Sequence, residues 1–175
     1  MVLFVCTGNL CRSPMAEAMF RHVLEERRCD GIETVSAGTW AAPGYGATTD
    51  AADVLSVKGI DLTQHKSRAL EKDELRAADL VVAMTSVHAK EIAELDSEAA
   101  DKTMFIKSLA RLDAQPHGAT TPDRLQELLA LPRPPWRREL DVDDPMGLPR
   151  SAYERAMSEI EGGVVKLADF LCPLG

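Results

Sequence analysis

Short β-branched runs alternate with longer segments of helical periodicity along this 175-residue chain. The runs lie at residues 3–5, 33–36, 80–83 and 104–106, and each is bounded by a helical pattern. Strands separated by helices are typical of βαβ units, in which helices cover both faces of a parallel sheet. Ligands of such sheets bind beyond the carboxyl ends of the strands. The alternation therefore predicts a ligand site near residue 6, which follows the first run.

The helical segments share apolar residues spaced three and four positions apart. Ser13-Pro14 is a typical helix start, because proline is tolerated at the first helical position. Ser151 and Glu154 predict a capping box at the start of the last helix, and Gly162-Gly163 would weaken its middle by about 1 kcal/mol per glycine. Helices are expected at residues 13–28, 47–57, 71–77, 86–95, 124–131 and 151–171.

Composition excludes several classes of protein. A net charge of −8 disfavours general nucleic-acid binding. The longest apolar stretches, such as residues 80–84, are far shorter than the roughly 20 residues that cross a membrane, and no secretory leader precedes the first strand. Four cysteines, at positions 6, 11, 29 and 172, are too few and too scattered for a disulfide scaffold. We therefore expect a soluble cytoplasmic domain spanning residues 1–175.

A proline-rich segment interrupts the alternation. Five of the ten prolines fall between residues 116 and 135. We interpret residues 112–140, approximately, as a long loop or insertion that carries one short helix, because the flanking pieces are too small to fold alone. Trp136-Arg137-Arg138 at its end could contact protein substrates or simply decorate the surface.

The loop after the first strand carries the clearest chemistry. It places a cysteine, five residues and an arginine between a strand and a helix, and such a loop can curl its N–H groups around an anion. The helix start adds a positive dipole end, and Arg12 supplies a planar fork that matches two phosphate oxygens. Gly8 and Asn9 tolerate the positive φ angles that curling requires. The predicted phosphate-binding residues are Thr7, Gly8, Asn9, Leu10, Cys11, Arg12 and Ser13.

Cys6 lies at the floor of this predicted loop. Helix N-termini and nearby cations stabilise thiolates, and a thiolate beneath a bound phosphate is a nucleophile for phosphoryl transfer. Ser13 could cap the helix or donate a hydrogen bond to the sulfur. The alternative, that Cys6 and Cys11 are only buried small hydrophobes, explains less of the surrounding pattern. A zinc site is disfavoured because the histidines, at 22, 65, 88 and 117, are scattered.

Residues 6–17 resemble the phosphate-binding loop of the low-molecular-weight protein-tyrosine phosphatases. Further matches lie at residues 36–39, 59–61, 65–68 and 78–81 with Met84, and at Asp144-Pro145. The resemblance implies an α/β fold in which a four-stranded parallel sheet is flanked by helices on both faces. It also implies hydrolysis of phosphotyrosyl proteins through a cysteinyl-phosphate, without metal or cofactor.

By this resemblance Cys6 attacks phosphorus, Arg12 holds the phosphate oxygens, and Asp144 protonates the leaving group and then activates water. We expect the neighbouring Asp141 and Asp143 to lie in a solvated turn. Supporting hydrogen bonds are expected from Asn9, Ser13, Ser36 and His65, and the pocket walls from Leu10, Trp40 and Met146. Many members have aromatic residues after Asp-Pro, whereas this chain has Met146-Gly147, which leaves the breadth of substrates open.

Other functions remain alternatives at this point. The opening segment and residues 83–85 with His88 also resemble the protein-arginine phosphatases, but that branch has threonine at the position of Leu10, which favours phosphotyrosine here. An arsenate reductase would need cysteines between Cys29 and Cys172, and none occurs. A silent phosphate-binding or redox module is disfavoured by the intact loop, although Cys11 could form a reversible disulfide with Cys6. Neither the physiological substrate nor the oligomeric state is indicated.

Overall fold

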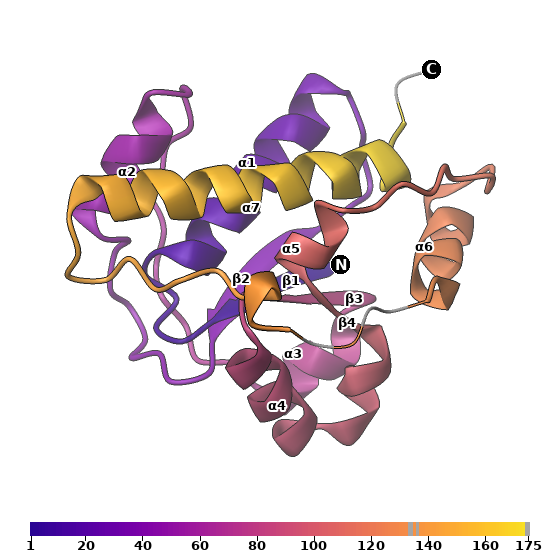
Figure 1. Ribbon diagram of the computed structural model, residues 1–175, viewed down its shortest axis with the longest axis horizontal. Coiled ribbons are helices and arrows are strands. Elements are labelled where there is room, and N and C mark those ends of the chain that lie inside the picture. Colours follow the sequence, from indigo (N-terminus) through magenta and orange to yellow (C-terminus); the bar gives the residue numbers. More distant parts are fainter. Residues whose placement is uncertain (133–134, 136, 174–175) are drawn as a thin grey trace.

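The structure is a computed structural model that describes residues 1–132, 135 and 137–173 (Figure 1). Its centre is a four-stranded sheet in the order β2-β1-β3-β4, and all three pairs of neighbouring strands are parallel. The strands are β1 (Val2–Cys6), β2 (Thr34–Gly38), β3 (Leu80–Ala83) and β4 (Thr103–Phe105). The predicted fold class is confirmed. Because β2 and β3 lie on opposite sides of β1, the topological switch point falls at Cys6.

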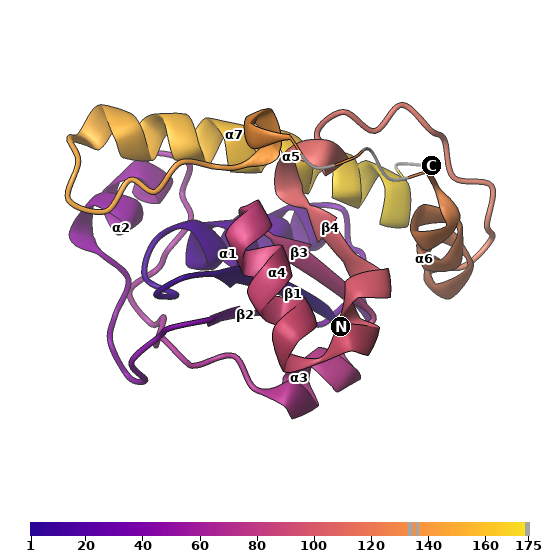
Figure 2. The same ribbon diagram turned by 60° about the horizontal axis from the view of Figure 1, so that its bottom comes forward.

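Helices cover both faces of the sheet, as expected (Figure 2). Val2 and Phe4 of β1 belong to the core that packs under α1 and α7, whereas Leu3 and Val5 belong to the smaller core under α3 and α4. This period of two is what a strand buried on both sides produces. The first face carries α1 (Arg12–Glu26), α2 (Thr49–Ser56), α5 (Ile106–Leu109), α6 (Thr121–Ala130) and α7 (Arg150–Leu171), and the second carries α3 (Lys72–Ala77), α4 (Ser86–Leu95) and the short 3₁₀ helix Ser97–Lys102.

The start of α7 differs from its prediction. Pro149 is the N-cap, Ser151 and Glu154 both lie inside the helix, and Glu154 accepts a hydrogen bond from Arg150 Nε at 3.0 Å. The predicted capping box is therefore wrong. Pro149, whose φ is −58°, already has the backbone angle that a helix start needs, so the helix begins before Ser151.

Two boundaries in the second half also move. Residue 106, predicted to end a strand, starts α5, so β4 ends at Phe105. Helix α6 begins at Thr121, three residues earlier than expected, because Thr120 and Asp123 form a capping box there.

Within the proline-rich segment, α6 packs beside the end of α7, and Arg124 Nη1 donates to Leu171 O at 3.1 Å. Trp136, proposed as a substrate contact, lies outside the described residues.

A disulfide joins two distant parts of the chain. Cys29, just after α1, is bonded to Cys172 at the end of α7, 143 residues away. Arg27 reinforces the junction, since it donates to Asp169 at 2.7 Å and to the Cys172 carbonyl at 3.2 Å. The number and spacing of the cysteines excluded a scaffold of several disulfides, and they did not predict this single disulfide. No helix within the described ranges is long and apolar enough to cross a membrane.

Gly163 permits the close packing of α5 on α7. A Cβ built on Gly163 would lie 2.3 Å from Ile106 O, whereas one on Gly162 would meet only Ala110 Cβ at 3.5 Å, an ordinary contact. The sequence shows that these two glycines weaken the helix, and the structure shows that only Gly163 is required there.

We predict that substitutions at the two neighbouring glycines affect stability differently. Gly163→Ala should lower the free energy of unfolding by roughly 1–3 kcal/mol, because α5 must move away from α7. Gly162→Ala, the matched control, should leave stability unchanged or raise it by up to about 1 kcal/mol. Urea unfolding of both variants measures the difference. Equal effects would contradict the close packing.

Candidate active site

The loop from β1 to α1 connects Cys6 with Arg12, the first residue of the helix. Asn9 adopts the left-handed conformation, with a φ of 52°, as expected. The same expectation for Gly8 is wrong: its φ is not positive, and a Cβ there would make only an ordinary contact with Leu10. Within the described structure, the main-chain N–H groups of residues 8–11 donate to no protein acceptor. They are the donors that an anion-binding loop keeps available.

Hydrogen bonds fix Asn9 in this conformation. Its Nδ2 donates to Ser13 Oγ at 3.0 Å and Ser36 Oγ at 2.9 Å, and its Oδ1 accepts from Arg68 N at 3.0 Å. His65 Nε2 lies 2.8 Å from its carbonyl oxygen. The expected supporting residues thus meet at Asn9, whereas sequence reasoning missed Arg68. Because Asn9 is buried with its polar groups paired, the strained backbone is stabilised by its surroundings.

The loop is also fastened to the end of β2. Thr39 N donates to Cys6 O and Trp40 N to Thr7 O, both at 2.9 Å. At Gly38 a Cβ would lie 2.4 Å from the Thr7 carbonyl oxygen, so only glycine allows this approach. The sequence of β2 therefore determines where the loop lies.

The Cys6 side chain contacts the first turn of α1. Its Sγ lies 2.9 Å from Ser13 Oγ, and Cys6 is only 2% exposed. Ser13 does not cap the helix, whose N-cap is Cys11. Since the Ser13 oxygen already accepts from Asn9, its own hydrogen can point to the sulfur or to the Ala37 carbonyl at 3.4 Å. A hydroxyl that donates to sulfur stabilises negative charge there.

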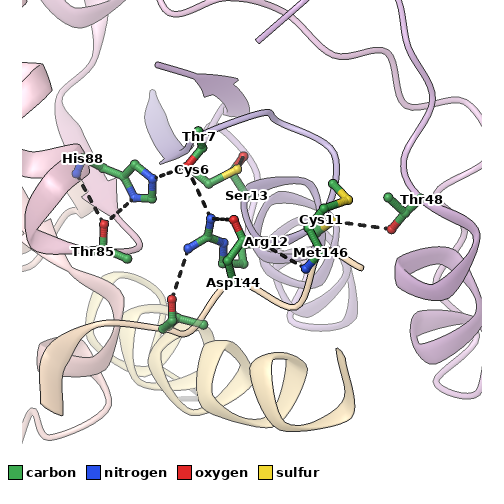
Figure 3. Close-up of polar contacts among 11 residues, drawn as sticks. Cys6, Thr7, Cys11, Arg12, Ser13, Thr48, Thr85, His88, Asp144 and Met146 are labelled. Atoms are coloured by element: carbon green, nitrogen blue, oxygen red, sulfur yellow. Dashed lines mark hydrogen bonds and ion pairs between the residues drawn. The ribbon is translucent and has the colours of Figure 1, made fainter. Parts of the chain in front are cut away.

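Arg12 brings residues from distant parts of the chain together (Figure 3). Its Nη1 donates to Val142 O at 3.1 Å, and its Nη2 donates to Asp144 Oδ2 at 2.5 Å and Thr7 Oγ1 at 3.4 Å. Arg12 is 4% exposed, whereas the Asp144 side chain is 49% exposed. Met146 N donates to the other Asp144 oxygen at 3.1 Å. The three predicted catalytic residues therefore lie in one site.

The two aspartates before Asp144 differ from each other. Asp143 is exposed and pairs with Arg138, as a solvated turn predicts. Asp141 is buried, and its carboxylate accepts from Ser86 N at 2.7 Å, at the start of α4. The expectation of a solvated turn is wrong for Asp141, because its side chain satisfies a helix N–H that would otherwise lack a partner.

The three predicted pocket-wall residues differ in burial. Leu10 is half-buried against the main core. Trp40, 77% exposed, lies just after β2, and its Nε1 donates to Glu91 Oε1 at 2.7 Å. Met146 is also exposed, next to Asp144. These positions make an apolar rim possible, and its contact with substrate stays a prediction.

A model of the low molecular weight phosphotyrosine protein phosphatase family matches residues 1–123. The chain belongs to this family. It is a hydrolase that acts on phosphate monoesters.

Relatives within this family are named for two activities. A protein-arginine-phosphatase from Geobacillus stearothermophilus is 36% identical over 97% of this chain and 95% of its own. The low molecular weight protein-tyrosine phosphatase A of Mycobacterium tuberculosis is 35% identical over 97% of this chain and 90% of its own. A solved structure of an arginine phosphatase mutant with a phosphorylated active-site serine is 33% identical, with a TM-score of 0.75, over 96% of this chain and 93% of that one.

Cys11 is the second cysteine of the loop. It is buried and free, and its Sγ lies 3.5 Å from Thr48 Oγ1. Burial raises the pKa of the Cys11 thiol, which keeps it neutral over a wider pH range than an exposed thiol. Its predicted role as a partner for oxidised Cys6 stays a hypothesis.

Sequence reasoning also missed the position of His88. Its ring is 2% exposed, with Nε2 2.9 Å from Thr7 Oγ1 and Nδ1 2.9 Å from Thr85 Oγ1. Burial, and then the charge of Arg12, lower the pKa of His88 to about 4. Thr85, three residues earlier, is a signal for a helix N-cap but not for a histidine beside the loop.

Acidification should destabilise the protein through His88. Unfolded histidine has a pKa of about 6.5, so between pH 6.5 and 4 the unfolded state binds a proton that folded His88 does not. This contribution to stability is present above pH 6.5 and is lost as the pH falls to about 4, by about 3 kcal/mol. Urea unfolding from pH 7 to 4 should therefore show a flatter pH dependence for His88→Gln than for wild type. His22→Gln on α1 is the control, and parallel curves for wild type and His88→Gln would contradict the prediction.

Proposed function

We propose that this chain dephosphorylates phosphotyrosine in proteins, with Cys6 as nucleophile. The observation that carries the proposal is the meeting of Cys6, Arg12 and Asp144 at the switch point of the sheet. A phosphate on the loop N–H groups and Arg12 would lie over the Cys6 sulfur. Preorganised donors of this kind stabilise the charge of a phosphoryl-transfer transition state.

Two balanced steps follow from these positions. In the first, the Cys6 thiolate forms an S–P bond while the P–O bond to tyrosine breaks, and Asp144 gives its proton to the departing oxygen. In the second, Asp144 takes a proton from water, whose oxygen attacks phosphorus and releases the Cys6 thiolate and inorganic phosphate. The arginine phosphatase relative whose mutant carries a phosphorylated active-site serine supports a covalent intermediate.

Asp144 has to change partner during this cycle. In the structure its carboxylate accepts a hydrogen bond from Arg12 Nη2. The same nitrogen would donate to an oxygen of a bound phosphate. Because the Asp144 side chain is half-exposed on a loop, it can leave the guanidinium with little loss of packing. Phosphate would take its place on Arg12, and Asp144 would turn to the leaving group.

Apolar residues beside the loop favour a phenyl leaving group. The side chain of Leu10 offers no hydrogen-bond acceptor, and the ring of Trp40 can stack on another aromatic ring. A phosphoarginine guanidinium carries several N–H donors, and burying them against Leu10 would leave donors unpaired.

Protein-arginine phosphatase activity is the second candidate. Its support is the 36% identity, over nearly the full length of both chains, to a relative with that name. The Asp144 carboxylate could accept from a substrate guanidinium. The two candidates share the cysteinyl-phosphate chemistry and differ in the leaving group.

The role of Asp144 is tested with leaving groups of different quality. Asp144→Asn should lower kcat/KM, which reports the first step, by roughly 100-fold or more for phenyl phosphate, a poor leaving group, and much less for p-nitrophenyl phosphate. Asp143→Asn, at the exposed neighbour, is the control and should change both rates little. Cys6→Ser should abolish turnover and keep affinity for inorganic phosphate. Equal slowing of both substrates by Asp144→Asn would remove Asp144 as the acid.

The substrate is tested with matched peptides. We expect kcat/KM for a phosphotyrosyl peptide to exceed that for the phosphoarginyl peptide of the same sequence by about tenfold or more. One unpaired buried donor costs about 1–3 kcal/mol, and about 1.4 kcal/mol corresponds to a tenfold difference. Leu10→Thr, which adds a hydroxyl acceptor, should narrow this ratio. Faster turnover of the phosphoarginyl peptide by the unmodified chain would favour the second candidate.

A further inference from the structure

A line of hydrogen bonds leads from α4 into the phosphate-binding loop (Figure 3). Thr85 Oγ1 lies 2.9 Å from His88 Nδ1, and His88 Nε2 lies 2.9 Å from Thr7 Oγ1. Thr7 Oγ1 in turn accepts from Arg12 Nη2 at 3.4 Å. The mechanism proposed above does not use His88, although its ring is buried beside the site.

We propose that His88 is a positioning residue, which holds the Thr7 hydroxyl where it orients the Arg12 guanidinium for phosphate. This inference rests on the proposed role of Arg12 in binding phosphate.

The acceptors of Arg12 explain why such a residue is needed. Burying a guanidinium costs free energy unless acceptors surround it, and Arg12 donates to Val142 O, Asp144 and Thr7. When Asp144 turns to the leaving group, Thr7 is the side-chain acceptor that remains on Nη2. Without a second partner, the hydroxyl of Thr7 could rotate about χ1 to another staggered position. The hydrogen bond to His88 removes that freedom.

His88 is itself held by the start of α4. Thr85, the N-cap, accepts from the His88 main-chain N–H at 3.4 Å and also contacts its Nδ1. In one neutral tautomer the ring donates to Thr7, and in the other it accepts from Thr7. In both, a lone pair of Thr7 Oγ1 remains for Arg12, so the orientation does not depend on the tautomer.

A double-mutant cycle on phosphate affinity tests the proposal. Thr7→Val keeps the shape of Thr7 and removes its hydroxyl, and His88→Leu removes the ring nitrogens. Each should weaken binding of inorganic phosphate, measured by calorimetry, by about tenfold, the loss expected for one hydrogen bond to a charged group. The double variant should lose no more than either single variant, because both act through one hydroxyl. Additive losses would overturn the proposal.

Rescue and a matched control separate positioning from folding. His88→Gln, whose amide can reach the position of the ring Nε2, should retain phosphate affinity within about threefold of wild type, roughly 0.65 kcal/mol. Thr39→Val should have no effect, since within the described residues the buried Thr39 hydroxyl has no partner. If His88→Leu does not fold, Thr7→Val with wild-type phosphate affinity still overturns the proposal.

Turnover separates this inference from the proposed function. The cycle is repeated on kcat/KM for p-nitrophenyl phosphate, where the same pattern is expected. A wild-type protein that binds phosphate but does not hydrolyse p-nitrophenyl phosphate would contradict the proposed function, and the binding cycle would still decide the role of His88.

Discussion

The buried positive charge of Arg12 determines how the carboxyl end of the sheet is arranged. A guanidinium removed from water costs several kcal/mol unless acceptors surround it. Those acceptors come from two separate parts of the chain: the loop supplies Thr7, and the segment before α7 supplies the main-chain carbonyl of Val142 and the carboxylate of Asp144. The same charge holds the segment before α7 against the loop and attracts an anion. Structure and chemistry therefore depend on one set of contacts.

The fold supplies the rigid frame for this charge. Parallel strands on both sides of β1 leave its carboxyl end at the switch point, and α1 begins there with its N–H groups facing the loop. Asn9 keeps its left-handed backbone because buried partners satisfy its side chain, and Gly38 lets the loop approach β2. The left-handed backbone of Asn9 costs about 1–3 kcal/mol, which the surrounding packing offsets. Geometry is thus fixed before substrate arrives.

Features of the fold that depend on neighbouring residues in the sequence could be predicted from the sequence. The strands, the covered sheet and the loop were accessible because their residues are contiguous, and Asp144 because a family resemblance marks it. Features that depend on long-range packing were not: His88 meets Thr7 from 81 residues away, and Gly163 matters only because α5 crosses there. The disulfide of Cys172 likewise follows from where two helices end. Such juxtapositions are determined by the fold, and no spacing in the sequence encodes them.

In the proposed mechanism, the Cys6 sulfur is the atom to which phosphate is transferred. Asp144→Asn removes the group that activates water, so with p-nitrophenyl phosphate, whose leaving group needs no proton, the phosphorylated enzyme should accumulate. Acid quenching during turnover, followed by peptide mass spectrometry, locates the phosphate. We predict the adduct on Cys6 and none on Cys11. Phosphate on any other residue, or turnover that persists in Cys6→Ser, would contradict it.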